Sequence, residues 1–186
     1  MLGLGLLVPG FTLLTALGAM VQFPMPPFGV PQTLQTLAVL LCALALGPRL
    51  GAVSMGLYVL CGIVGVPLFA DGEAGWATIL GQTGGYLVGF VACQPVAHWI
   101  IRRGDRSFRG WGSVVVAGLA VHAVVFLFGV PWLYVVRRLD PETADITLWQ
   151  AVHGGCVVFL PGMVLKTATA TFIALMLRPE MGRRVW

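Results

Sequence analysis

The sequence predicts an all-α integral membrane protein with six transmembrane helices and both termini in the cytoplasm. Its 186 residues are 58% hydrophobic and only 10% charged, whereas a soluble domain carries about a quarter charged residues. Long apolar runs alternate with short polar clusters, and the chain accommodates about six runs of the roughly 20 residues that cross a bilayer. We therefore expect a single membrane domain over 1–186, without a soluble catalytic module.

The six predicted spans follow one another with short connections. The first run, MLGLGLLVPGFTLLTALGAM, has no positively charged residue ahead of it and is long enough to cross, so we interpret it as a span and not as a signal peptide. A short, separate helix is expected over 147–158. The spans are expected at 2–21, 32–47, 50–66, 82–101, 112–136 and 160–177.

Basic residues indicate which ends of the spans face the cytoplasm. With both termini inside, only Arg137 and Arg138 lie outside, and Lys166 falls within a span. An excess of basic residues on one side is typical of the cytoplasmic face, so the basic residues report topology and no nucleic-acid partner is expected. The cytoplasmic set is Arg49, Arg102, Arg103, Arg106, Arg109, Arg178, Arg183 and Arg184.

Small residues recur at helical spacing on two spans. Gly81, Gly85 and Gly89 form a stripe that lets another backbone approach closely, and Thr15 and Ala19 form a similar pair on the first span. Two interpretations are open: packing within the chain, or docking of a partner membrane subunit.

Lys166 is the residue that points most directly to function. A charged lysine at the centre of a span costs roughly 2.5–3.5 kcal/mol on insertion scales, and such residues are usually functional. Pro161 is suited to the first turn of the last span, so the lysine lies near a helix start, where the helix dipole adds positive potential. The pattern predicts a site for an anion or a strong acceptor, with snorkelling or deprotonation of the lysine as alternatives.

Further polar residues open the second and fourth spans at the same membrane level. Three helix starts can together surround a pocket that is mostly apolar with a few placed polar groups, as small-molecule sites are. Phe69 and Trp76, in the loop between the third and fourth spans, are possible lid residues. The candidate ligand-binding residues are Lys166, Tyr86, Gln82, Thr83, Gln35 and Met163.

The sequence carries no motif that indicates catalysis. GMVLKT has Leu165 where a phosphate-binding loop requires glycine, and His98, His122 and His153 lack the spacing of metal ligands. We therefore expect no catalytic residues, no metal and no cofactor, and an intramembrane enzyme is the most distant alternative.

Four segments resemble the BioY family, the substrate-binding membrane components of energy-coupling factor biotin transporters. The similarity extends over nearly the whole chain, in the correct order and spacing. The segments are VPQTLQTLAVLLCALALGPRLG (30–51), GIVGVPLFADGEAGWATILGQTGGYLVGF (62–90), FGVPWL (128–133) and FLPGMVLKTA (159–168).

The resemblance implies a six-helix protein in the cytoplasmic membrane of a prokaryote, surrounded by lipid, that captures biotin from outside. Release inside would then require a transmembrane coupling subunit and a pair of ATPases. Small-residue faces of the first span dock the coupling subunit in such systems, which makes Thr15 and Ala19 candidate docking positions. Lys166 is expected to donate to the ureido oxygen or the carboxylate of biotin, and Gln82, Thr83, Tyr86 and Gln35 to accept from the ureido N–H groups.

Met163 departs from the family pattern, which is similar to FLPGD and has an acid three residues before the lysine. A thioether is a weak acceptor and carries no charge to neutralise Lys166. Three explanations are open: a neighbouring amide replaces the acid, the ligand is the counter-ion, or the chain binds a different or weaker ligand. Another small carboxylated vitamin or a biotin precursor is thus an alternative ligand, and a non-binding structural membrane subunit is an alternative function.

Overall fold

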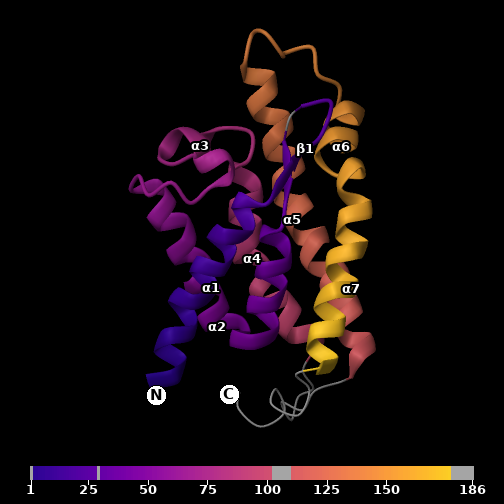
Figure 1. Ribbon diagram of the computed structural model, residues 1–186. Helices are drawn as coiled ribbons and strands as arrows, with labels where there is room; N and C mark the ends of the chain where they lie inside the picture. Colours follow the sequence, from indigo (N-terminus) through magenta and orange to yellow (C-terminus); the bar gives the residue numbers. More distant parts are fainter. Residues whose placement is uncertain (1, 29, 102–109, 177–186) are drawn as a thin grey trace.

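The computed structural model describes residues 2–28, 30–101 and 110–176, and these form helices and one short hairpin (Figure 1). The helical membrane class predicted from composition is confirmed: within the described residues, four helical segments are long and apolar enough to cross a bilayer. The elements are α1 (Leu2–Met20), β1 (Gln22–Pro24), β2 (Pro31–Thr33), α2 (Gln35–Ile63), η1 (Ala70–Gly72), α3 (Trp76–Leu80), α4 (Gly84–Ile101), α5 (Trp111–Leu139), α6 (Leu148–Gly155), η2 (Val157–Phe159) and α7 (Leu160–Met176).

α2 is two helical halves that fold back on each other at Gly47. Gly47 has φ 71° and ψ −170°, a backbone conformation that glycine adopts without steric cost, and Pro48 follows it. In a continuous helix, Gln35 and Tyr58 would lie about 35 Å apart. The Gln35 amide nitrogen instead donates to the Tyr58 hydroxyl over 2.6 Å, so the two halves run antiparallel. They correspond to the expected segments 32–47 and 50–66.

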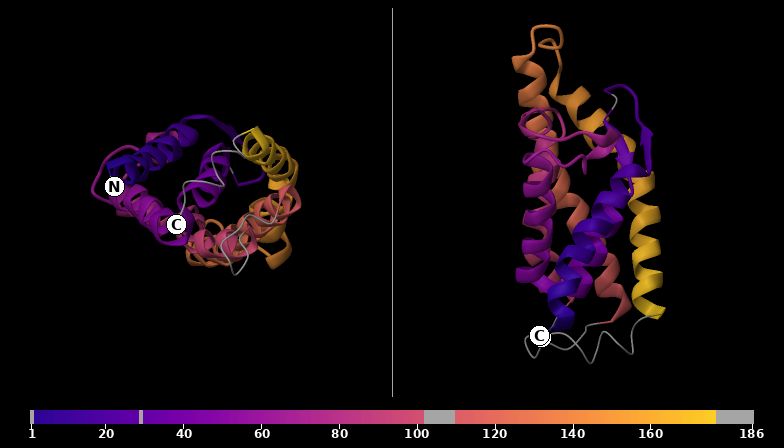
Figure 2. Two further views of the ribbon diagram at one scale, coloured as in Figure 1. Left: turned by 90° about the horizontal axis from the view of Figure 1, so that it is seen from below. Right: turned by 60° about the vertical axis from the view of Figure 1, so that its left-hand side comes forward.

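The first half of α2 lies inside the helix bundle. None of its residues from 35 to 46 is exposed, and from below the other helices surround it (Figure 2, left). Its 12 residues rise only about 18 Å, which is shorter than a lipid-facing span requires. The helix begins at Gln35, three residues later than the expected 32, because residues 31–33 form β2, which pairs antiparallel with β1.

Polar side chains join α1 to the second half of α2. The Thr12 hydroxyl donates to the Ser54 carbonyl oxygen over 3.0 Å, and the Ser54 hydroxyl donates to the Val8 carbonyl oxygen over 2.8 Å. Hydrogen bonds of this kind hold apolar helices together where hydrophobic burial does not drive association.

The glycine stripe of α4 packs against α5 within the chain. A Cβ at Gly89 would lie 2.8 Å from the Cα of Val125, and a Cβ at Gly85 would collide with Trp132 and the Phe128 carbonyl oxygen. Only glycine permits this distance between the two backbones. Gly81 precedes α4, and its carbonyl oxygen accepts a hydrogen bond from the Trp132 indole over 2.8 Å.

The loops gather at two opposite ends of the bundle. α1 begins at the lower end in Figure 1, whereas the β1–β2 hairpin, η1, α3 and the segment 140–147 lie at the upper end. Because Gln35 follows the hairpin and meets Tyr58, the turn at Gly47 between the two antiparallel halves of α2 lies at the other end. The acids Asp71, Glu73 and those of 140–147 are thus at the end opposite Arg49. The expected cytoplasmic residues of 102–109 and 178–184 lie outside the described residues.

We predict that Gly89→Ala destabilises the chain by about 1–3 kcal/mol, because the added methyl group would overpack the α4–α5 contact. Gly56→Ala is the matched control: its Cβ would meet nothing within 4 Å, and alanine should add about 0.5–1 kcal/mol to helix stability. Thermal unfolding in detergent measures both. Equal melting temperatures for the two variants would contradict this packing.

Candidate functional site

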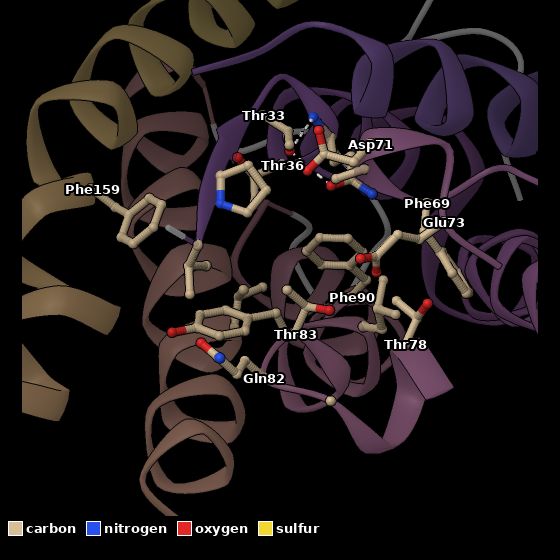
Figure 3. A pocket seen from close by; sticks show the side chains of 18 of the residues that line it. Thr33, Thr36, Phe69, Asp71, Glu73, Thr78, Gln82, Thr83, Phe90 and Phe159 are labelled. Carbon is tan, nitrogen blue, oxygen red and sulfur yellow. Dashed lines mark hydrogen bonds between the residues drawn. The ribbon is translucent and has the colours of Figure 1, made fainter. Parts of the chain in front are cut away.

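A cavity of about 560 Å³ opens at the upper end of the bundle. Its walls come from the β1–β2 hairpin, the first half of α2, the segment 69–83, α4, α5 and α7, so segments distant in the sequence converge on it (Figure 3). The structure places six sequence-predicted residues on its lining: Lys166, Tyr86, Gln82, Thr83, Gln35 and Met163.

Lys166 is buried on the α7 wall. Its side chain is 8% exposed, and its ammonium group donates to the Thr36 hydroxyl over 3.0 Å. Snorkelling to the membrane interface is therefore not its conformation here. A neutral hydroxyl orients the ammonium group without neutralising its charge, so the group remains available to an acceptor in the cavity.

Gln35 lies on the cavity wall and joins β2 and the two halves of α2 by hydrogen bonds. Its amide oxygen accepts from the Thr33 hydroxyl over 2.8 Å, and its amide nitrogen donates to Tyr58, whose hydroxyl donates to the Leu68 carbonyl oxygen. Both ends of the amide are engaged, so Gln35 fixes the start of α2 and the loop after its second half.

Gln82 is oriented by Arg137. The Nε and Nη2 atoms of Arg137 each lie 3.3 Å from the Gln82 amide oxygen, and its guanidinium stacks on the Phe28 ring at 4.1 Å. Guanidinium only donates, so the Gln82 amide oxygen faces Arg137. The expectation that Gln82 accepts ureido hydrogens stays a prediction, and this contact occupies the oxygen that would accept them.

Tyr86 keeps its acceptor capacity. Its hydroxyl donates to the Gly155 carbonyl oxygen over 2.8 Å, which uses the only proton, so toward any further group the oxygen can only accept. This contact also ties α4 to the end of α6.

The two expected lid residues occupy different places. Phe69 is 2% exposed, lines the cavity, and meets the Tyr58 ring edge-on with centroids 5.6 Å apart. Trp76 is 63% exposed and is not part of the cavity wall, so its assignment as a lid residue was wrong in this structure. Trp76 begins α3, and it lies two residues before Thr78, the buried residue of that helix, which puts the two on opposite helix faces.

Two acids that the sequence analysis did not select, Asp71 and Glu73, line the cavity. Asp71 accepts a hydrogen bond from the Gln22 side chain, which joins the η1 loop to β1. The signal was present in the sequence, because two of only seven acids fall in a loop that was expected to cap the pocket.

His122 and Phe28 are further lining residues that sequence reasoning missed. His122 lies on α5, and a lone histidine in an apolar span gave no spacing pattern to detect. Phe28, at the turn of the hairpin, packs against Gly154 of α6, where a Cβ would collide with its ring. The turn of the hairpin thus contributes to the cavity wall.

Thr15 and Ala19, the expected docking positions, are both 0% exposed. Thr15 donates to the Phe11 carbonyl oxygen over 2.8 Å and lies against the Met55 sulfur. The small-residue pair therefore packs on α2 within the chain, and the expectation that it contacts a partner directly was wrong for this structure. The exposed face of α1 carries Leu6, Leu13 and Leu17 instead.

Comparison with known proteins gives one consistent result. The model of the BioY family matches residues 4–183. The "Probable biotin transporter BioY" of Pyrococcus horikoshii is 36% identical over 168 residues, which cover 90% of this chain and 91% of that protein. The "Biotin transporter BioY" of Thermotoga maritima is 34% identical with the same coverage.

A solved structure shares the fold. It is the crystal structure of the S-component for biotin from an ECF-type ABC transporter, with a TM-score of 0.83 and 22% identity, and the match covers 98% of this chain and 96% of that one. Because the family model extends over nearly the whole sequence and relatives above 30% identity cover most of it, this chain belongs to the BioY family.

Proposed function

We propose that this chain captures biotin from outside the cytoplasmic membrane of a prokaryote, as the substrate-binding component of an energy-coupling factor transporter. The observation that carries the proposal is the buried Lys166 ammonium group on the wall of a 560 Å³ cavity. This volume lies within the range of about 300–1,000 Å³ that is typical of small-molecule sites. The names of the relatives above supply the identity of the ligand.

The chemistry of the cavity suits biotin. Lys166 supplies charge-assisted donation to the ureido oxygen or to the carboxylate, which is stronger than donation from a neutral group. The Tyr86 hydroxyl oxygen supplies an acceptor for an N–H group, and the Gln82 NH₂ group supplies a second donor near the mouth. Phe69, Phe90 and Phe126 supply apolar surface for the sulfur-containing ring.

In this proposal six helices place both termini inside: α1, the two halves of α2, α4, α5 and α7, of which the first half of α2 is the short one inside the bundle. The mouth of the cavity then faces outward. The positive-inside distribution of arginines in the sequence supports this orientation. A transmembrane coupling subunit and an ATPase pair would power release, and lipid surrounds the exposed leucines of α1.

A second candidate ligand is another small carboxylated vitamin or a biotin precursor. Met163 favours it, because the methionine lines the cavity one helical turn before Lys166 and offers no strong acceptor there. No observation favours a structural subunit without a ligand, since Lys166 lies inside an open cavity.

Lys166→Met should weaken biotin binding by about 10- to 150-fold, because a hydrogen bond from a charged group contributes roughly 1.5–3 kcal/mol. The melting temperature should not fall, since the change removes a buried charge. Isothermal titration of detergent-purified protein measures the affinity. Leu165→Met, at the exposed neighbouring position, is the control. Full tolerance of Lys166→Met would favour a non-binding structural role.

Met163→Asp should separate the two candidate ligands. If biotin is the ligand, the new carboxylate adds an acceptor beside Lys166 and biotin affinity should rise by about tenfold or more. Mass spectrometry of the molecule that co-purifies with the unaltered chain identifies the ligand independently. A co-purifying molecule other than biotin, together with unchanged or weaker biotin binding in Met163→Asp, would favour the alternative.

The orientation predicts which loops are accessible from outside the cell. In a chain whose native cysteines are replaced, Glu142→Cys should react with a membrane-impermeant maleimide in intact cells. Arg49→Cys, which is also exposed but lies at the other end, should react only after permeabilisation. The reverse pattern would place the cavity mouth in the cytoplasm.

A further inference from the structure

His122 presents an unused acceptor at the cavity. The side chain is 2% exposed, lines the cavity, and its Nδ1 atom lies 2.8 Å from the Gly118 carbonyl oxygen. A carbonyl oxygen only accepts, so Nδ1 must carry the proton and donate. A doubly protonated ring would place a second buried cation on the wall of the cavity that Lys166 lines, which is unfavourable. The neutral ring therefore leaves a lone pair on Nε2.

The Nε2 atom of His122 has no hydrogen-bond partner among the residues that the structure describes. Leaving a buried acceptor unpaired is costly, and such groups in native structures call for a partner. The other nitrogen is held in place by its own helix, so the ring cannot turn this lone pair away without breaking the bond to Gly118.

Two contacts show which residue of α7 lies opposite His122. Gly118 packs against the Thr167 side chain, and the Phe126 ring meets the Phe159 ring with centroids 6.3 Å apart. From the first contact to the second, the residue number rises by eight on α5 and falls by eight on the segment that ends in α7. The two segments therefore run antiparallel. Midway between them, His122 lies level with Met163, one turn from Lys166.

We propose that Nε2 of His122 accepts a hydrogen bond from an N–H group of the captured ligand. His122 thereby supplies from α5 the deep acceptor that the Met163 thioether cannot supply from α7. The inference rests on the proposed function, because biotin carries two ureido N–H groups beside the carbonyl oxygen to which Lys166 can donate. His122 would then favour ligands that carry an N–H group next to a carbonyl group.

Two amide variants separate the acceptor from the rest of the ring. His122→Asn places its amide where Nδ1 lies, so it can still donate to Gly118, but it has no atom at the position of Nε2. His122→Gln reaches that position and can place an oxygen there. Isothermal titration of biotin into the detergent-purified full chain should show a loss of about ten- to a hundredfold for His122→Asn and retention of most affinity for His122→Gln.

A second measurement uses the unaltered chain, in case His122→Asn does not fold. Of the two mono-N-methyl biotins, at least one should bind about ten- to a hundredfold more weakly than biotin. The proposal is overturned if both methylated compounds bind as tightly as biotin, or if the Asn and Gln variants bind biotin equally. If the folded, unaltered chain binds no biotin at all, the proposed function itself fails and this inference fails with it.

Discussion

A buried ammonium group is the constraint on which the site depends. Lys166 is held among apolar helices with the neutral Thr36 hydroxyl as hydrogen-bond partner, so its charge calls for a further acceptor. A ligand that brings an oxygen with high electron density into the cavity provides it. Met163, one turn before the lysine on the same helix, provides neither charge nor a strong acceptor. The acceptor for the ammonium group must therefore come from the ligand or from side chains on other helices.

The backbone arrangement makes such a site possible inside a membrane. The first half of α2 is short and has no exposed residue between 35 and 46, so it can begin at the depth of Lys166 without exposing its backbone groups to lipid. Gly47 lets the chain reverse, and Gln35 joins the two halves through Tyr58. Arg137 then links α5 to the start of α4 through Gln82 and to the hairpin through Phe28. Hydrogen bonds and the Arg137–Phe28 contact thus join the segments that form the mouth of the cavity.

The helical class and the convergence of the site residues could be predicted from the sequence because both depend on local patterns. Apolar runs locate the helices, and polar residues at the starts of three helices must lie at a similar depth. Pairings between distant residues could not be predicted. The side of Gln82 that faces the ligand depends on Arg137, 55 residues away. The small-residue pair Thr15 and Ala19 predicts close packing, but it does not show whether α2 or a partner is the neighbour. A role for His122 could be inferred only once the structure placed it at the level of Met163.

The most direct test of the central claim is an experimental structure of the chain with biotin bound. If Lys166 binds the ligand, an oxygen atom of biotin lies within hydrogen-bond distance, about 3 Å, of its amine inside the cavity. Biotin located elsewhere, or an amine that points into lipid headgroups with the cavity closed beside it, would show that Lys166 does not hold the ligand.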